Sequence, residues 1–138
     1  MGKTKEGHVI VRDNKELGRI GENLTLCRYV DRGWKPVAVN WRAGTKAELD
    51  VIVFRESEDL LCFCEVKTRT IDRGCSGTDI APADSVNARK RMKIKFAAKL
   101  FIEKNPAYAE KNVRFDVAEV YSDSTHNEVR IEYLENAF

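Results

Sequence analysis

Two carboxylates and a lysine stand out in the stretch 47–69: Asp50, Glu65 and Lys67. The stretch has the pattern of two strands joined by a polar turn at 56–59, and side chains alternate between the two faces of a strand. If the turn is symmetric, Asp50 lies directly opposite Glu65. Their Cβ atoms would then be about 4.5–5.5 Å apart. Two facing carboxylates repel each other, so something must hold this pair together.

A divalent cation is one explanation for the pair, because Mg²⁺ binds a few carboxylate oxygens together with water molecules. The other explanation is a solvated face of the hairpin, with a tolerated repulsion and an ion pair between Glu48 and Lys67. The spacing alone leaves both explanations open. With a cation, the set would suit phosphodiester hydrolysis. A metal ion lowers the pKa of a bound water, and a lysine orients that water or stabilises the transition state.

The elements that must position these residues are predicted to form a mixed sheet flanked by helices. Helical spacing of apolar residues predicts one helix over 14–31 and a second from Asp84 or Ser85 to Lys104. Alternating patterns predict strands over 35–42, 47–55, 60–69, 113–121 and 129–134. This order of elements favours an α/β fold. The remaining expectations are a loose arm at 1–12, a single domain over 13–138, and a loop at 70–83 that is either functional or a simple connection.

The first predicted helix carries a carboxylate that could reach the hairpin. Its expected buried stripe is Leu17, Ile20, Leu24 and Cys27. Gly18 and Gly21 lie within the helix, although glycine costs about 1 kcal/mol in a helix interior. We therefore expect another backbone to approach the helix closely at these glycines. Glu22 follows directly and is either solvated or directed at the hairpin.

The second predicted helix combines an apolar arc with positive charge. Its expected apolar arc is Val86, Met92, Ile94, Phe96, Ala97, Leu100 and Phe101. Lys90 and Lys93 fall within the arc, where an unpaired lysine is costly. They either pair with the protein's own carboxylates or meet a phosphate. Seven basic and two acidic residues between Asp84 and Lys104 make the positive charge local.

Composition and motifs exclude several other classes of function. The 138 residues carry a net charge of +2, four cysteines and two histidines. Without a CxxC pair a zinc site is not expected, and Cys62 and Cys64 are expected in the core. There is no G-x-S-x-G elbow, P-loop or evident Cys–His pair. No apolar run is long enough to span a membrane, so no membrane partner is expected, and the cysteines fit a reducing, cytoplasmic setting.

Several motifs in a fixed order carry a resemblance to a known family. They are Gly21-Glu22, Asn40-x-Arg42, Glu48-Leu49-Asp50, Glu65-Val66-Lys67-x-Arg69, Lys90 with Lys93, Arg114-Phe115-Asp116-Val117 and Asn136-Ala137-Phe138. An aspartate on one strand followed by Glu-x-Lys on the next resembles the PD-(D/E)xK nuclease superfamily, which has the restriction-endonuclease-like fold. Within it, the chain resembles the YraN family of bacterial proteins. Two departures are Ala47, where that family usually has glycine, and the loop sequence at 72–75.

The resemblance implies an αβββαβ core and assigns roles to the candidate residues. Asp50 and Glu65 would be metal ligands together with the backbone carbonyl of Val66, and Lys67 would be catalytic. Glu22 would be the additional carboxylate of the first helix, as in related Holliday-junction resolvases, and would join the catalytic and metal-binding set. Residues expected to face nucleic acid are Lys90, Lys93, Arg69 and Arg89.

The sequence therefore predicts an endonuclease that hydrolyses DNA phosphodiesters with Mg²⁺ or Mn²⁺, with branched or damaged DNA as candidate substrates. The alternative is a non-catalytic module that binds nucleic acid on a nuclease scaffold. A third reading is an interaction protein without affinity for DNA. Because junction-resolving relatives act as dimers, a homodimer is also a candidate state.

Overall fold

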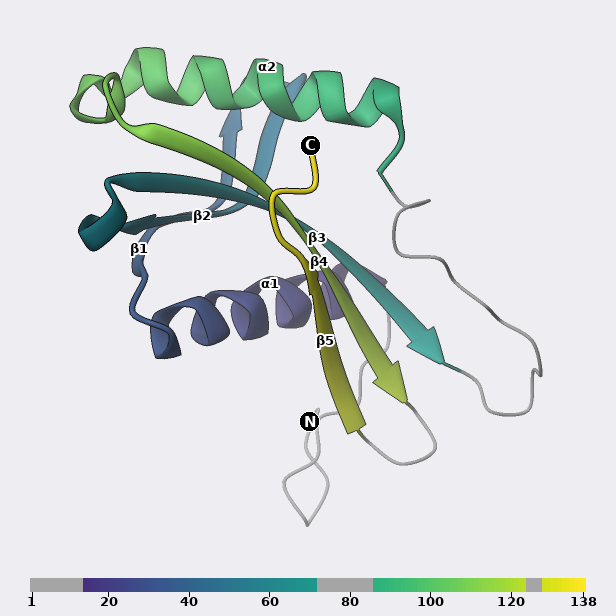
Figure 1. The fold of residues 1–138 in the computed structure, drawn as a ribbon. Coiled ribbons are helices and arrows are strands. Elements are labelled where there is room, and N and C mark those ends of the chain that lie inside the picture. The colour runs from purple at the N-terminus through teal and green to yellow at the C-terminus, as the bar shows by residue number, and fades with distance from the viewer. Residues whose placement is uncertain (1–13, 72–85, 124–127) are drawn as a thin grey trace.

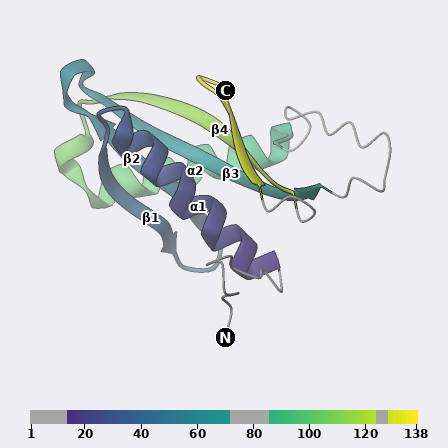
Figure 2. The same cartoon turned by 90° about the horizontal axis from the view of Figure 1, so that it is seen from below.

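The chain folds into a five-stranded mixed sheet with one helix on each face, as Figures 1 and 2 show. The computed structural model describes residues 14–71, 86–123 and 128–138. The elements are α1 (Asn14–Asp31), β1 (Lys35–Ala43), β2 (Ala47–Arg55), β3 (Leu60–Ile71), α2 (Ala88–Lys104), β4 (Asn112–Asp123) and β5 (Glu128–Leu134). Short 3-10 helices lie at Glu56–Glu58 and Pro106–Tyr108. The predicted order of elements and the αβββαβ core are confirmed. The predicted arm at 1–12 lies outside the described residues.

The strands follow one another in the order β1-β2-β3-β4-β5, and only β3 and β4 run parallel. Parallel neighbours need a long crossover, and α2 lies within the one that joins these two strands. Their ladder extends from Leu60 opposite Asn112 to Ile71 opposite Asp123. Residues 70 and 71, predicted to begin a loop, instead complete β3, and residues 72–83 of that loop lie outside the described residues.

The two faces of the sheet bury two separate apolar clusters. The cluster under α2 includes Ile52, Leu61, Phe63 and Phe101. The cluster under α1 is made of Tyr29, Trp34, Val51, Val53, Cys62, Cys64 and Ala118. Both β3 cysteines are therefore core residues, as predicted. Neither α1 nor α2, the two α-helices of the described chain, has the length and apolarity needed to cross a membrane.

Helix α1 has the predicted bounds but packs through a different face. Its buried residues recur every four positions: Leu17, Gly21, Thr25 and Tyr29. Of the stripe expected from hydrophobicity, Ile20 and Leu24 are only half-buried and Cys27 is exposed. This buried face is hard to recognise from the sequence because it contains a glycine and two hydroxyl groups, which a hydrophobicity pattern does not mark as buried. Thr25 donates to the Gly21 carbonyl at 2.8 Å, which lets its hydroxyl be buried.

The two glycines of α1 predict opposite effects of substitution by alanine. A Cβ at Gly21 would overlap the Thr68 side chain of β3, whereas a Cβ at Gly18 would meet nothing within 4 Å. We expect Gly18→Ala to stabilise the protein by up to about 1 kcal/mol through helix propensity. Gly21→Ala should lose that gain and more, since overpacking costs about 1–3 kcal/mol. Urea unfolding of both variants measures the difference, and equal stabilities would contradict the close approach at Gly21.

Helix α2 begins later and buries a narrower face than predicted. Residues 86 and 87 are not helical, and Asn87 caps the helix by accepting a hydrogen bond from the Lys90 N–H at 2.9 Å. The buried residues of the helix are Ile94, Ala97, Ala98 and Phe101. Met92 and Phe96, both placed in the expected apolar arc, are 72% and 56% exposed. A helix lying flat on a sheet covers only one stripe, so the wide arc was an overestimate.

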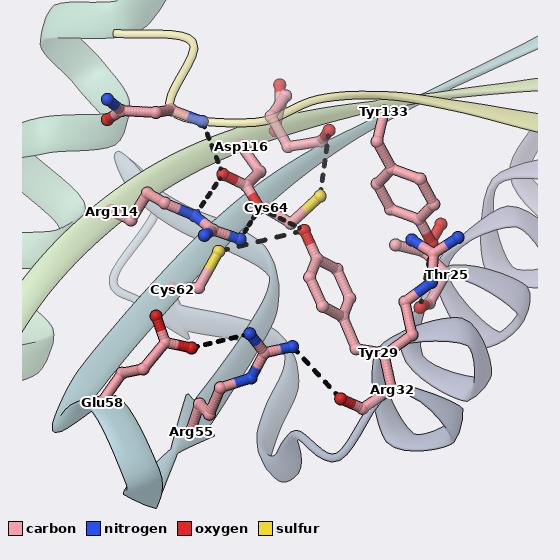
Figure 3. A network of polar contacts seen from close by, with 12 residues as sticks. Thr25, Tyr29, Arg32, Arg55, Glu58, Cys62, Cys64, Arg114, Asp116 and Tyr133 are labelled. Carbon is pink, nitrogen blue, oxygen red and sulfur yellow. Dashed lines mark hydrogen bonds and ion pairs between the residues drawn. The ribbon is translucent and has the colours of Figure 1, made fainter.

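A buried carboxylate ties β4 to α1 and to the C-terminal segment (Figure 3). Asp116 is fully buried and accepts two hydrogen bonds at 2.9 Å from Arg114. It also accepts hydrogen bonds from the Tyr29 hydroxyl at 2.7 Å and from the Asn136 backbone N–H at 2.9 Å. The motif Arg114-Phe115-Asp116-Val117 thus has a structural role, since its carboxylate satisfies donors from three segments.

Candidate functional site

The β2–β3 hairpin has the register that turn symmetry predicts. Its ladder pairs Arg55 with Leu60 and continues to Val51 opposite Cys64, which is the alignment that would next place Asp50 opposite Glu65. The ladder ends there, and Asp50 makes a different contact. Its Oδ2 accepts a hydrogen bond from the Val66 backbone N–H at 2.9 Å. The backbone pairing of the hairpin therefore gives way to a side-chain contact at the candidate site.

The neighbouring strand is also irregular at this point. In the β1–β2 ladder, Val39 pairs with Val51 and Trp41 with Leu49, so Asn40 is the residue level with Asp50. Asn40 has a φ of 53°, a left-handed conformation that asparagine tolerates better than most residues. The left-handed backbone accounts for an asparagine at this place in the strand. The distortion of β1 therefore lies level with the Asp50 carboxylate.

A cleft of about 1200 Å³ opens beside these irregular strands. Helix α1 contributes Glu22 to its wall, β2 and β3 contribute Asp50 and Glu65, and α2 contributes a row of residues that includes Lys90. The two helices cover opposite faces of the sheet, as Figure 1 shows. Because the sheet separates the two helices, residues of both can line one cleft only where the pairing of the strands is interrupted. That interruption is the point where the ladder between β2 and β3 has ended. This placement brings together carboxylates that are far apart in sequence.

Burial and neighbouring carboxylates raise the pKa of two acidic residues in the cleft, Asp50 and Glu22. Glu65 is 7% exposed. Burial, a hydrogen bond to Glu65 and the charge of Glu65 together raise the pKa of Asp50 to about 9, while the Val66 N–H acts in the opposite direction. The pKa of Glu22 is raised by its partial burial and by the charges of Glu48 and Glu65. The cleft therefore disfavours the simultaneous ionisation of Asp50 and Glu65.

A lysine from α2 supplies part of the missing positive charge. Lys90 Nζ lies 2.8 Å from Glu65 Oε2. Of the two alternatives for Lys90, the structure therefore has the ion pair with the protein's own carboxylate. Although burial opposes it, the hydrogen bonds to Glu65 and Lys67 raise the pKa of Lys90. Lys67 lies beside this pair, and burial together with its hydrogen bond to Lys90 and the charge of Lys90 lowers its pKa.

The expected ion pair between Glu48 and Lys67 is wrong. Glu48 instead contacts Arg42 of β1, with 3.3 Å between its Oε1 and the Arg42 Nη2. Register explains the change, because Arg42 is the direct partner of Glu48 in the β1–β2 ladder, whereas the β2–β3 ladder has ended before it reaches Glu48. Lys67 is thereby left close to Asp50, Glu65 and Lys90.

Comparison with known proteins places the chain in a family. The profile of the uncharacterised protein family UPF0102 matches residues 21–120. The chain belongs to this family. It is the YraN family that the motifs resemble, so that part of the sequence interpretation is confirmed. The matched stretch includes all the predicted catalytic residues: Glu22, Asp50, Glu65 and Lys67.

Individual UPF0102 proteins match the chain over most of its length. A UPF0102 protein of Porphyromonas gingivalis is 37% identical over 91% of this chain and 86% of its own. One from Dictyoglomus thermophilum is 35% identical over 91% and 99% of the two chains. One from Caldicellulosiruptor bescii is 32% identical over 90% and 98%. These relatives extend the match beyond single motifs to the domain as a whole.

The basic residues predicted to face nucleic acid are divided in this UPF0102 protein. Arg89, Lys90 and Lys93 all line the cleft, and Arg89 and Lys93 are exposed. Arg69 is placed differently, because its guanidinium lies 3.3 Å from Oε2 of the fully buried Glu119 on the neighbouring strand. Its charge therefore serves at least in part to compensate a carboxylate inside the sheet.

Several residues that line the cleft were not identified from the sequence as site residues: Thr45, Lys46, Asn87, Met92 and Phe96. Met92 and Phe96 were assigned to the core because they are apolar. A signal for the correct assignment is nevertheless present, since the spacing of Arg89, Met92, Lys93 and Phe96 places them on one helical stripe. A stripe that contains two basic residues is poorly suited to burial.

The donor chemistry of the cleft fits a hard cation. Asp50 and Glu65 lie within hydrogen-bonding distance of each other, and the Lys90 ammonium already neutralises one of them. Mg²⁺ characteristically uses one or two carboxylates and completes its shell with water. Among residues 14–71, 86–123 and 128–138, no three acidic, histidine or cysteine side chains form a group that could hold a metal. The fit thus rests on two carboxylates rather than on a complete protein cage.

Proposed function

We propose that this UPF0102 protein is an endonuclease that hydrolyses DNA phosphodiesters with Mg²⁺ or Mn²⁺. The observation that carries the proposal is the Asp50–Glu65 pair, in which burial and the neighbouring Glu65 raise the pKa of Asp50, in a cleft lined with basic side chains. Such a pair is costly unless a cation binds it. A cleft that is acidic at its base and basic along one wall suits a metal ion and a phosphate together.

The residues of the cleft can be assigned roles in this chemistry. Asp50 and Glu65 would hold the metal ion with the Val66 carbonyl, and Glu22 of α1 lines the same cleft without completing a group of three carboxylate ligands among the described residues. A bound Mg²⁺ would supply a water of lowered pKa and neutralise charge that develops on the phosphate. Lys67 would orient that water, and its lowered pKa brings its amine closer to a neutral, proton-accepting form.

Lys90 has a role that changes with the charge around it. In the present arrangement its ammonium binds Glu65, with 2.8 Å between Nζ and Oε2. Lys90 is still 40% exposed on its side chain, so it can turn toward the cleft. Its ammonium would then face a DNA phosphate, together with Lys93 and Arg89 on the same wall. In this proposal Lys90 binds Glu65 when DNA is absent and a phosphate when DNA is bound.

Lys67→Ala tests the enzymatic proposal. Plasmid, branched and single-stranded DNA are incubated with the protein in Mg²⁺, Mn²⁺ or EDTA, and cleavage is followed on gels. We expect metal-dependent cleavage that falls by about 100-fold or more in Lys67→Ala, because the side chain that orients the attacking water is lost. Lys99→Ala is the matched control, since Lys99 is an exposed α2 lysine that does not line the cleft. Undiminished cleavage by Lys67→Ala would indicate a contaminant and contradict the proposal.

A non-catalytic nucleic-acid-binding module is the second candidate. The observation in its favour is the Lys90–Glu65 ion pair, which neutralises one carboxylate without a metal ion. Titration calorimetry with Mg²⁺ and Mn²⁺ separates the candidates. An endonuclease should bind the ion and lose that binding in Asp50→Ala. A binding module should retain DNA, leave it uncut under every metal condition and bind it more weakly as salt rises.

A further inference from the structure

Two large apolar side chains are exposed on the wall of the cleft. Met92 is 72% and Phe96 56% exposed, and both line the cleft that contains Asp50 and Glu65. Isolated apolar residues on a protein surface are ordinary. These two, however, are neighbours on one helix, four positions apart, and they lie beside the proposed catalytic carboxylates. Their position indicates a contact with whatever enters the cleft.

Basic residues alternate with the two apolar side chains. Three residues follow Arg89 at intervals of three, four and seven positions: Met92, Lys93 and Phe96. At this spacing the four side chains form one exposed stripe along α2. The stripe contains no acidic residue. Lys46, at the turn between β1 and β2, is also exposed and lines the same cleft. The ligand of this surface must therefore present both negative charge and flat apolar groups.

We propose that Phe96 stacks on an unpaired base of a nucleic-acid strand, with Met92 beside it and with the strand's phosphates against Arg89 and Lys93. The inference rests on the proposed function and specifies its substrate class, a strand with unpaired bases next to the scissile phosphate. Proteins that bind single strands combine a basic groove with aromatic side chains on which bases stack. An alternation of cations and apolar side chains matches the alternation of phosphates and bases along a strand.

Duplex DNA fits this surface less well. In a duplex the base faces are stacked on one another, and exposing one costs a few kcal/mol of unstacking and unpairing. A single strand, a flap or a junction presents a base face at a much lower cost. Phe96 therefore distinguishes substrates by strandedness, whereas Arg89 and Lys93 contact phosphates, which both forms possess.

Binding measured in EDTA tests the inference separately from catalysis. Fluorescence anisotropy compares a labelled oligothymidylate with a duplex of equal length. For Phe96→Ala we expect the dissociation constant for the single strand to rise by about 5- to 150-fold, the range for loss of one stacked base. The constant for the duplex should change less than about twofold. Phe96→Trp should retain single-strand binding, and Val30→Ala, a matched change at an exposed apolar residue of α1, should leave both constants unaltered.

Each contrary outcome is informative. Unchanged single-strand affinity in Phe96→Ala, or an equal loss for single strand and duplex, overturns the stacking role. A shift in oligomeric state in Phe96→Ala, measured by sedimentation, would assign the surface to self-association and also overturn it. Selective single-strand binding by a protein that cuts nothing supports this inference while contradicting the endonuclease. Metal-dependent cleavage with a strand preference unaltered in Phe96→Ala refutes this inference alone.

Discussion

In the absence of metal at pH 8, Asp50→Asn should be more stable than the wild type by about 0.5–2 kcal/mol, the usual range for a stabilising substitution. The variant is nearly isosteric, and its amide oxygen can still accept from the Val66 N–H. What it removes is the cost of keeping an ionisable carboxyl at a position where burial and Glu65 disfavour its charged form. Urea unfolding measures the difference.

The pH dependence of this difference follows from the raised pKa of Asp50. The pKa is about 9 in the folded protein against an ordinary value of 3.8 for an aspartate, so the folded state holds the proton more tightly than the unfolded state. The contribution of Asp50 to stability is therefore complete below pH 4 and declines as pH rises toward 9. The advantage of Asp50→Asn should vanish near pH 4 and be largest near pH 9. An advantage independent of pH would contradict the electrostatic explanation.

Metal should reverse the order of the two proteins. At a Mg²⁺ concentration 100 times the dissociation constant, binding stabilises the folded wild type by about 2.7 kcal/mol. Asp50→Asn, with a weaker metal site, should gain little and lose cleavage. Asp59→Asn is a suitable control, because Asp59 is an exposed carboxylate paired with Lys111, and such pairs contribute at most about 1 kcal/mol. Equal stabilisation of wild type and Asp50→Asn by Mg²⁺ would exclude Asp50 as a ligand.

Asp116→Ala should be the most destabilising of the substitutions proposed for this protein. It leaves the Arg114 guanidinium, the Tyr29 hydroxyl and the Asn136 N–H without their common acceptor. Removing one partner of a buried ion pair costs about 3–5 kcal/mol. That loss is comparable to the whole stability of many domains, about 5–15 kcal/mol. Thermal unfolding by circular dichroism measures it.

Two milder variants keep this prediction testable if Asp116→Ala does not fold. Tyr29→Phe removes a single hydrogen bond and should cost about 0.5–1.5 kcal/mol. Asp116→Asn keeps an acceptor but loses the charge, so its stability should fall between those of Tyr29→Phe and Asp116→Ala. If Asp116→Asn were as stable as the wild type, the charge of Asp116 would have no structural role.

The sequence predicts this fold well wherever a regular repeat is sufficient. The two-residue alternation and a symmetric turn define the β2–β3 register, which the structure confirms from Arg55 opposite Leu60 to Val51 opposite Cys64. The bounds of α1 also agree with the prediction. These features depend on local periodicity, which a single sequence records directly.

Other features depend on partners that are distant in sequence. The buried face of α1 includes Gly21, whose missing side chain makes sense only beside Thr68 of β3. Phe96 is apolar and was assigned to the core, although it is exposed and lines the cleft instead. The cation that meets Glu65 could not be chosen from the sequence either, because several lysines of α2 were available and tertiary packing selects Lys90.

The hydrogen bond between the Val66 amide and Asp50 gives the protein a spectroscopic reporter. This amide is held by a carboxylate rather than by a partner strand, at a point where the β2–β3 ladder has already ended. Its proton chemical shift and its rate of hydrogen exchange therefore depend on the charge and position of one side chain. A single resonance of an isotopically labelled sample follows the state of the cleft, without a substrate and without any assumption about whether the protein is an enzyme.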